Sequence, residues 1–328
     1  MIVKKRKTCC PTWAPFSKME WEGEVVIEQM CLDTVQIKEK MKDIVKKNIF
    51  EDELSKLLIL FIESRKFFPF AESAFLHYCV FGGKEFEIAI ELGAGIEIIT
   101  LSSDILDDIQ DNDNLTAPWM NIDQSVALSA VFSLYTVGLH SLNAVDPNSD
   151  IVNCIIKYCL DAMQGQHRDI INKPQTEEDC LEAMKLKCGS LFALANVSAT
   201  MLATGTYNKV VESYSYSKGI FEQIYGDYTA LFNPNRSDIL KDKHTLVNLF
   251  LKRLFNKDSE ELLTIFKNEN LFYELLSKEE FMGKLKKAGV TQYVSVLHKI
   301  YKKKCETDIE KLNLDKHKIE LVKKQLLN

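Results

Sequence analysis

The sequence predicts an all-α protein, and three observations support this fold class. The chain contains only 13 glycines and 7 prolines among 328 residues, about half of the roughly 7% glycine and 5% proline of average proteins. Apolar residues recur at helical spacing in segment after segment, and no hairpin dipeptide separates two alternating runs. A β-sandwich and a collagen-like repeat are excluded, because both need more turn residues.

Apolar stripes mark the expected helices in chain order. The clearest stripes are formed by Leu57, Leu58, Phe61 and Ile62, by Ile151, Ile155, Ile156, Tyr158 and Cys159, and by Leu246, Leu249, Phe250 and Leu254. Breaks are expected at Pro69, Gly82–Gly83, Pro118, Asp146–Pro147, Pro174, Gly205, Pro234 and Gly289. The pattern predicts one domain of roughly ten helices, which ends in an amphipathic helix pair over residues 297–328.

The first forty residues differ from the rest of the chain. They contain a basic run at residues 4–7, adjacent cysteines and two of the three tryptophans. The basic run is not followed by an apolar segment, so it does not indicate a secretory signal. Met41 begins a segment that reads equally well as a natural start. We therefore treat residues 1–40 as an N-terminal extension and residues 41–328 as the main domain.

Composition and charge exclude several classes of function. The formal net charge is −6, whereas nucleic-acid binding draws its affinity from Lys and Arg that neutralise phosphates. The nine cysteines include no Cys-x-x-Cys pair, so they indicate reduced thiols in a cytoplasmic protein rather than a zinc site. No uninterrupted apolar run approaches the ~18 residues of a transmembrane helix, so stable membrane insertion is not expected.

Four aspartates share one face of a predicted helix that continues from the apolar run 96–101. At ~100° per residue, Asp104, Asp107, Asp108 and Asp111 lie within a sector about 100° wide. Like charges four residues apart destabilise a helix by ~0.2–0.5 kcal/mol per pair, so a helix in bulk water gains nothing from them. This carboxylate face is suited to a hard divalent cation such as Mg²⁺. The alternative interpretation is a solvated acidic helix end.

Further motifs accompany the aspartates in a fixed order along the chain. They are Gly82-Gly83-Lys84, Asp107-Asp108-x-x-Asp111, Gly165-Gln166-x-x-Asp169, Lys187-Cys188-Gly189, Gln223-Ile224-x-x-Asp227, and Ser237-Asp238-Ile239 with Lys243. In type and order these motifs resemble those of the isoprenyl diphosphate synthase family. Segments 70–73, 93–97, 162–167 and 288–293 resemble the members of that family that prenylate a tryptophan of a pheromone precursor peptide.

This resemblance implies an isoprenoid synthase-type helical bundle around a central cavity, with residues 41–328 as a prenyltransferase domain. It implies two or three Mg²⁺ ions, a geranyl or farnesyl diphosphate donor, and a tryptophan of a quorum-sensing precursor peptide as acceptor; a homodimer is compatible with it. The implied metal ligands are Asp104, Asp107, Asp108, Asp111 and Asp227, and all but Asp104 are also the implied catalytic residues. The implied substrate-binding residues are Lys84, Gln166, Asp169, Lys187, Gln223 and Lys243.

Departures from the synthase motifs favour transfer to a peptide over chain elongation. Elongating members hold isopentenyl diphosphate with arginines, but Glu85 follows Lys84 here and residues 114–118 replace the expected arginine pair. A glutamate would repel the diphosphate that an arginine binds bidentately. Two alternatives stay open: a short-chain prenyl diphosphate synthase, and a non-catalytic subunit of one. The second of these is motivated by Gly226 and Ala230, which stand in place of motif aspartates.

Overall fold

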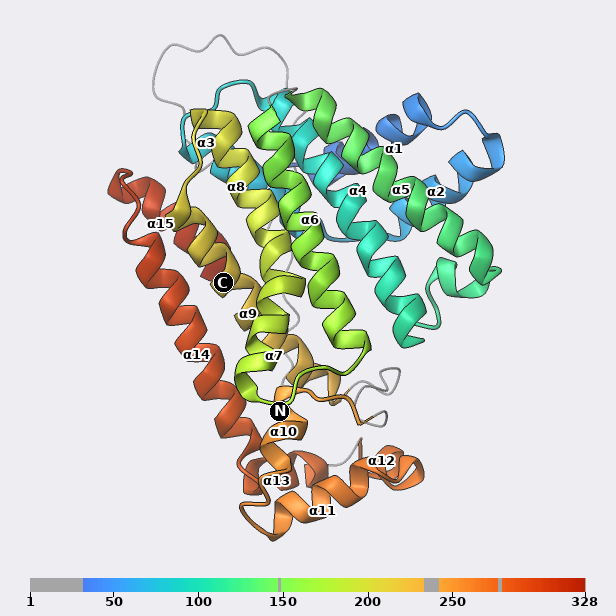
Figure 1. Cartoon of the computed structure of the whole chain (residues 1–328), viewed down its shortest axis with the longest axis vertical. Helices are drawn as coiled ribbons and strands as arrows, with labels where there is room; N and C mark the ends of the chain where they lie inside the picture. The colour runs from blue at the N-terminus through green and yellow to red at the C-terminus, as the bar shows by residue number, and fades with distance from the viewer. Residues whose placement is uncertain (1–31, 147–148, 233–241, 277–278, 328) are drawn as a thin grey trace. The chain divides into compact units, whose positions relative to one another are not determined.

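The computed structural model describes residues 32–146, 149–232, 242–276 and 279–327, which all belong to one compact unit, Cys31–Asn328. The described residues contain helices and no strand, so the all-α prediction is confirmed. Figure 1 shows long helices that run side by side, with shorter helices gathered at one end. The motif residues Ser237, Asp238 and Ile239 lie outside the described residues.

The described part of the chain forms fifteen α-helices. They are α1 (Thr34–Asn48), α2 (Asp52–Ser64), α3 (Pro69–Val80), α4 (Phe86–Asp111), α5 (Gln124–Val145), α6 (Ser149–Ile170), α7 (Glu177–Met184), α8 (Ser190–Thr204), α9 (Lys209–Ala230), α10 (Leu246–Leu251), α11 (Lys257–Phe266), α12 (Glu269–Leu276), α13 (Glu279–Lys287), α14 (Val290–Ile309) and α15 (Lys316–Leu327). A 3₁₀ turn, η2 (Pro118–Asn121), precedes α5, and a π-helical turn, η3 (Lys185–Gly189), joins α7 to α8.

The first two apolar stripes lie in α2 and α6 as predicted, and the third lies in α10 except for Leu254, which follows that helix with φ 54°. The described residues form more than the roughly ten helices expected. Leu58, Phe61 and Ile62 are the buried residues of α2, and the terminal helix pair is α14 and α15. The additional helices include the short ones α11 to α13, which with α10 bury a shared set of apolar side chains against α7, α9 and α14. Each is too short to show more than two or three apolar repeats, so periodicity could not separate them.

Helix α1 crosses the boundary that we placed at residue 40. Asp33 caps its first turn by accepting a hydrogen bond from the Val35 N–H, and Ile37 and Met41 are both fully buried. Residues 34–40 are therefore part of a helix that contributes to the core of the main domain. Residues 1–31 lie outside the described residues.

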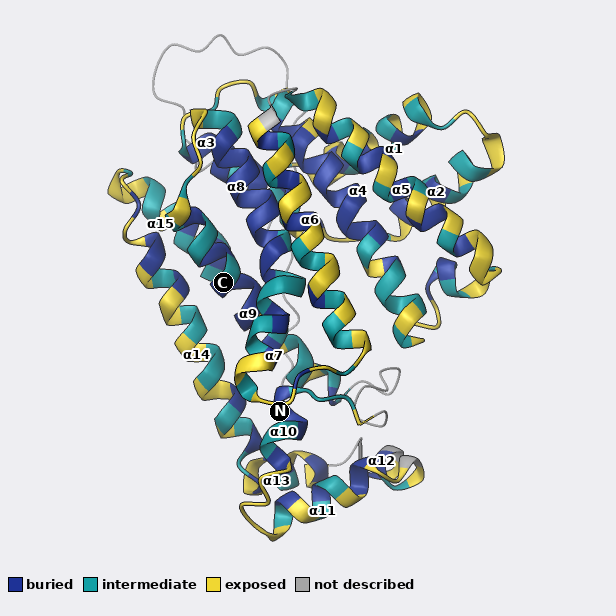
Figure 2. Cartoon of the chain, in the orientation of Figure 1, coloured by how far each residue is buried: buried dark blue, intermediate teal, exposed yellow. Residues whose placement is uncertain are grey.

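Helix α4 forms the centre of the bundle and positions the aspartates. Most of its residues between Ala89 and Ser102 are buried, whereas its last two turns are mostly intermediate or exposed (Figure 2). Gly138 of α5 allows a close approach, because a Cβ there would lie 2.6 Å from Ile99 Cγ1 and 3.2 Å from the Gly95 carbonyl oxygen. This contact fixes α5 beside the segment of α4 that leads to the acidic turns.

Two stretches are long and apolar enough to cross a membrane, by length and composition alone. They are α5 and the continuous segment Glu177–Thr204, whose apolar windows are 39% and 61% buried within the fold. The second stretch therefore lies mostly within the core, as buried helices of globular proteins do. The cytoplasmic location stays a prediction.

A buried polar network joins α3, α8 and α9. His77 is fully buried, with its Nδ1 2.6 Å from the Ser73 carbonyl oxygen and its Nε2 2.7 Å from the Tyr214 hydroxyl. The Ser73 hydroxyl donates to Asn196 at 2.6 Å, and the Asn196 amide donates to Ser215 at 2.9 Å. The network satisfies polar groups that would otherwise be costly to bury. Burial lowers the pKa of His77 to about 4.

The pKa of His77 predicts a specific loss of stability in mild acid. The unfolded chain binds a proton on His77 near pH 6.5 while the folded chain binds it only near pH 4, so protonation favours the unfolded state between these values. Between pH 7 and pH 5 this single group should lower the free energy of unfolding by about 2 kcal/mol. Urea unfolding at pH 7 and pH 5 should show this decrease in the free energy of unfolding, and His77→Gln should make the decrease smaller. An equal decrease in the wild-type protein and the variant would contradict the assignment.

Candidate active site

A cavity of about 670 Å³ opens between α4, α5, α6, η3, α9 and the segment that leads into α10. Part of its lining is apolar and includes Val131, Phe132 and Met163. The same lining contains the polar and charged residues singled out by the sequence motifs, which are Asp104, Asp107, Asp108, Asp111, Gln166, Asp169, Lys187, Gln223, Asp227 and Lys243. Residues up to 139 positions apart in sequence are thus brought to one site.

The aspartate turns lie at the C-terminal end of α4, which ends at Asn112 in a left-handed conformation (φ 52°). A helix C-terminus carries partial negative charge, so additional carboxylates there are unfavourable without cations. The four aspartates divide into two pairs. Asp107 and Asp111 contact lysines on one side, whereas Asp104 and Asp108 are hydrogen-bonded on the other. Sequence spacing placed them on one face and could not show this division.

Two lysines hold the first pair of aspartates together with Asp169. Lys187 Nζ lies 2.8 Å from Asp107 Oδ1 and 2.9 Å from Asp169 Oδ2. Lys243 Nζ lies 2.8 Å from Asp111 Oδ2 and 3.2 Å from the same Asp169 oxygen. Burial alone would raise the pKa of Asp169, but the two ammonium groups lower it below its ordinary value. The carboxylate is therefore charged at neutral pH.

The position of Lys187 is fixed by an unusual local backbone. It lies within the π-helical turn η3, a feature that often marks functional sites in helices. Gly165 of α6 faces this turn, and a Cβ there would lie 2.3 Å from the Lys187 backbone nitrogen. The next residue, Gln166, donates to Asp107 Oδ1 at 2.7 Å. The motif Gly165-Gln166-x-x-Asp169 thus combines close packing with two polar contacts to the site.

Asp227 and Gln223 line the same cavity from α9. Gln223 donates its amide to Asp227 and accepts a hydrogen bond from the Cys188 thiol at 2.8 Å. Burial raises the pKa of Cys188 to about 12, so it is a neutral thiol and not a nucleophilic thiolate. The cavity therefore offers carboxylates, amides and ammonium groups, and its lining includes no reactive cysteine among the residues described.

The donor chemistry of the site fits a hard divalent cation. One oxygen from each of Asp107, Asp111 and Asp169 lies within 4.8 Å of the other two. Magnesium binds oxygen ligands at ~2.0–2.1 Å, so oxygens around one ion are separated by ~3–4 Å. These three carboxylates can therefore hold a Mg²⁺ ion with small adjustments. Asp169, which the motif resemblance assigned to substrate binding, belongs to this group, whereas Asp104 and Asp108 do not.

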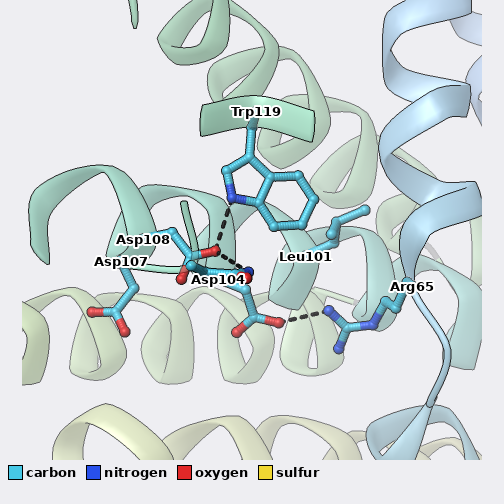
Figure 3. Close-up of a pocket in the computed structure, with 7 residues that line it drawn as sticks. Arg65, Leu101, Asp104, Asp107, Asp108 and Trp119 are labelled. Carbon is cyan, nitrogen blue, oxygen red and sulfur yellow. Dashed lines mark hydrogen bonds and ion pairs between the residues drawn. The ribbon is translucent and has the colours of Figure 1, made fainter. Parts of the chain in front are cut away.

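The second pair of aspartates lines a smaller pocket of about 280 Å³ (Figure 3). Asp104 Oδ2 accepts from Arg65 at 2.6 Å, and Asp108 Oδ2 accepts from the Trp119 indole N–H at 2.8 Å and from Asn114 at 3.0 Å. Burial raises the pKa of Asp108 above its ordinary value, although the hydrogen bonds from Asn114 and Trp119 oppose the shift. Sequence reasoning missed Arg65, Asn114 and Trp119 as site residues.

Lys84 is the one implied site residue that the structure does not bring to the cavity. It is exposed in the loop before α4, whereas the aspartates occupy the last turns of that helix. A helix of 26 residues is ~39 Å long at 1.5 Å per residue, which is beyond the reach of any side chain. Arg65, at the C-terminal end of α2, is paired with Asp104 and is a basic residue of the site that no motif indicated.

A bundle of helices whose cavity is lined by carboxylates, lysines and apolar side chains is suited to a substrate with an anionic head and an apolar chain. The polyprenyl synthetase family model matches residues 65–277, and the chain belongs to this family. It is accordingly a prenyltransferase, as its motifs predicted.

Relatives of known name and structure agree with this family. Tryptophan prenyltransferase ComQ from Bacillus subtilis (strain 168) is 57% identical over 289 residues, which cover 88% of this chain and 97% of that protein. The ComQ protein of Bacillus subtilis subsp. natto is 42% identical over 94% of this chain and 98% of its own length. A geranylgeranyl pyrophosphate synthase structure superposes with a TM-score of 0.77 at 16% identity, covering 88% and 94% of the two chains, which supports the fold.

Proposed function

We propose that this chain transfers a geranyl or farnesyl group from its diphosphate to a tryptophan side chain of a ComX-like quorum-sensing precursor peptide. The observation that supports the donor half is the group of Asp107, Asp111 and Asp169 with Lys187 and Lys243, which lines a cavity that also has apolar side chains in its lining. The printed name of the 57%-identical relative, tryptophan prenyltransferase, supports the acceptor half.

The charged residues would bind the diphosphate head of the donor. Asp107, Asp111 and Asp169, with Asp227 on the other side of the cavity, would hold two or three Mg²⁺ ions. When bound, Mg²⁺ supplies positive charge that stabilises the departing diphosphate. Lys187 is kept protonated, because Asp107 and Asp169 raise its pKa although burial would lower it. The Lys187 ammonium group can therefore donate hydrogen bonds to oxygens of the donor diphosphate.

The apolar part of the lining would bind the prenyl chain. Val131, Phe132 and Met163 contribute surface that favours an isoprenoid over water. In the transfer, the bond between prenyl C1 and the diphosphate oxygen breaks, and its electron pair leaves with the diphosphate. Indole C3 of the acceptor supplies the electron pair of the new carbon–carbon bond. The indole N1 proton is then lost, so the product is neutral.

Mass spectrometry of a tryptophan-containing precursor peptide tests this proposal. The enzyme is incubated with Mg²⁺, the peptide, and either geranyl or farnesyl diphosphate, and the expected product carries one added prenyl group on tryptophan. A parallel incubation with isopentenyl diphosphate should give no elongated diphosphate. Efficient elongation without peptide modification would identify a short-chain synthase instead, and absence of both products would identify a non-catalytic subunit.

A further inference from the structure

We propose that the pocket formed by Arg65, Leu101, Asp104, Asp108 and Trp119 binds the indole of the acceptor tryptophan and does not bind a second diphosphate. This inference rests on the proposed function, because it assigns the acceptor a place in the same active site. The pocket is separate from the larger cavity but adjoins it, since Asp104, Asp107 and Asp108 line both.

The charges in the pocket oppose a second diphosphate. Its lining contains one guanidinium, that of Arg65, and three carboxylates, those of Asp104, Asp107 and Asp108. The guanidinium is already paired twice, to Asp104 Oδ2 at 2.6 Å and to Glu97 Oε2 at 2.8 Å. A diphosphate would have to displace both carboxylates, and one of them, Glu97, is fully buried. A neutral group meets no such cost.

The size and walls of the pocket suit an aromatic ring. Its volume is about 280 Å³, and Leu101 and Trp119 supply its apolar surface (Figure 3). The Trp119 ring is held in place by its N–H bond to Asp108 and by an edge-to-face contact with Phe61 at 5.6 Å. A rigid, pre-positioned aromatic wall lowers the entropy cost of binding and favours offset or edge-to-face contact with a second ring.

The pocket also places the acceptor for reaction. Neighbouring positions of α4 carry Asp107, which is paired with Lys187, and Asp104, which is paired with Arg65 of the pocket. An indole in the pocket would therefore lie across one helical turn from the donor head group. Asp104 binds Arg65 through Oδ2, so Oδ1 is the oxygen with which it would accept the indole N1 proton after the carbon–carbon bond has formed.

Binding of a minimal indole probe tests the assignment. Calorimetry would measure the affinity of N-acetyl-tryptophanamide for full-length enzyme that holds Mg²⁺ and a thio-diphosphate donor analogue. Leu101→Phe, which fills the pocket, should weaken this affinity by about tenfold or more. The matched change Leu160→Phe, on an exposed part of α6 outside both pockets, should leave it unchanged. Equal affinity in all three proteins would overturn the proposal.

A second experiment measures pyrophosphate binding and does not require that the core variant Leu101→Phe folds. Inorganic pyrophosphate is titrated into the same donor-loaded enzyme, and no further equivalent should bind to the wild-type protein. Asp104→Ala, a change at a half-exposed side chain, releases one partner of Arg65 and should create measurable pyrophosphate binding. A second equivalent on the wild-type protein would overturn the proposal. Failure of the donor analogue itself to bind would instead contradict the proposed function, so the two failures are distinguishable.

Discussion

Asp107→Asn and Asp111→Asn should each lower the rate of prenyl transfer by at least ~10²–10³-fold, because each removes several kcal/mol of charge stabilisation from the departing diphosphate. Asparagine keeps the size of the side chain but loses the negative charge that a divalent cation requires. Asp107 and Asp111 are also the aspartates of α4 whose oxygens converge with that of Asp169. Initial rates of peptide prenylation, measured by mass spectrometry at saturating donor, check this expectation.

The control for these variants is the same substitution on another helix. Asp43→Asn, on α1, changes a carboxylate that is 69% exposed and lies outside both pockets, so the rate should not change. The two active-site variants should also require more Mg²⁺ for half-maximal rate, whereas loss of a merely structural contact would not alter that requirement. Full activity of both variants would show that these aspartates do not hold the metal.

The fold was predictable because its long helices bury continuous apolar faces. The run 96–101 in α4 is followed directly by four aspartates, so both the buried segment and its acidic end could be read from spacing. The short helices α11–α13 could not be read in this way, since each buries only a few side chains and packs with α10 against α7, α9 and α14.

The site was predictable where residue type and helical spacing decide the chemistry. Lys187, Lys243 and Asp169 were identified from motifs, and the structure places their side chains within hydrogen-bonding distance of one another or of the aspartates. Lys84 and Arg65 show the limit of this reasoning. Which of the two reaches the aspartates depends on the end of α4 at which each neighbouring loop lies, and that is a property of the tertiary fold alone.

The sequence also could not predict that the four aspartates of α4 divide into two pairs with different partners. Asp104 and Asp108 differ from Asp107 by less than one helical turn, yet they face other partners. Those partners come from the end of α2 and from η2, two segments that carry no motif. Nothing in the sequence around Trp119 indicated that it belongs to the site, because packing is the usual role of a buried tryptophan.

Arg65→Met should destabilise the protein by about 3–5 kcal/mol, the usual cost of removing one partner from a buried ion pair. Glu97 is fully buried, and its Oε1 already accepts the N–H groups of Phe70 and Ala71 at the first turn of α3, at 2.8 and 2.9 Å. Its Oε2 is paired with Arg65 at 2.8 Å and accepts a longer hydrogen bond from the Thr100 hydroxyl at 3.3 Å, so of the described residues Arg65 is its one cationic partner. Without the guanidinium, an uncompensated negative charge would be left in the core beside Asp104.

Urea unfolding at two pH values separates this mechanism from simple loss of packing. Burial raises the pKa of Glu97 even though Arg65 lowers it, so removal of Arg65 must raise that pKa further. The folded state of the variant then binds a proton that the unfolded state releases, and its stability should fall as the pH rises from 5 to 8. The double variant Arg65→Met/Glu97→Gln, which has no buried charge at this position, should recover part of the stability and lose this pH dependence.

Arg253→Met is the matched control, because it breaks an ion pair with Glu177 in which the arginine side chain is 47% exposed. Such pairs contribute ~0–1 kcal/mol, so this variant should unfold at nearly the wild-type urea concentration. If Arg65→Met were no more destabilising than Arg253→Met, Glu97 would have to be protonated already in the wild-type protein. The Arg65 guanidinium would then be less tightly engaged than its two short contacts indicate, and the charge argument against a second diphosphate would lose its main support.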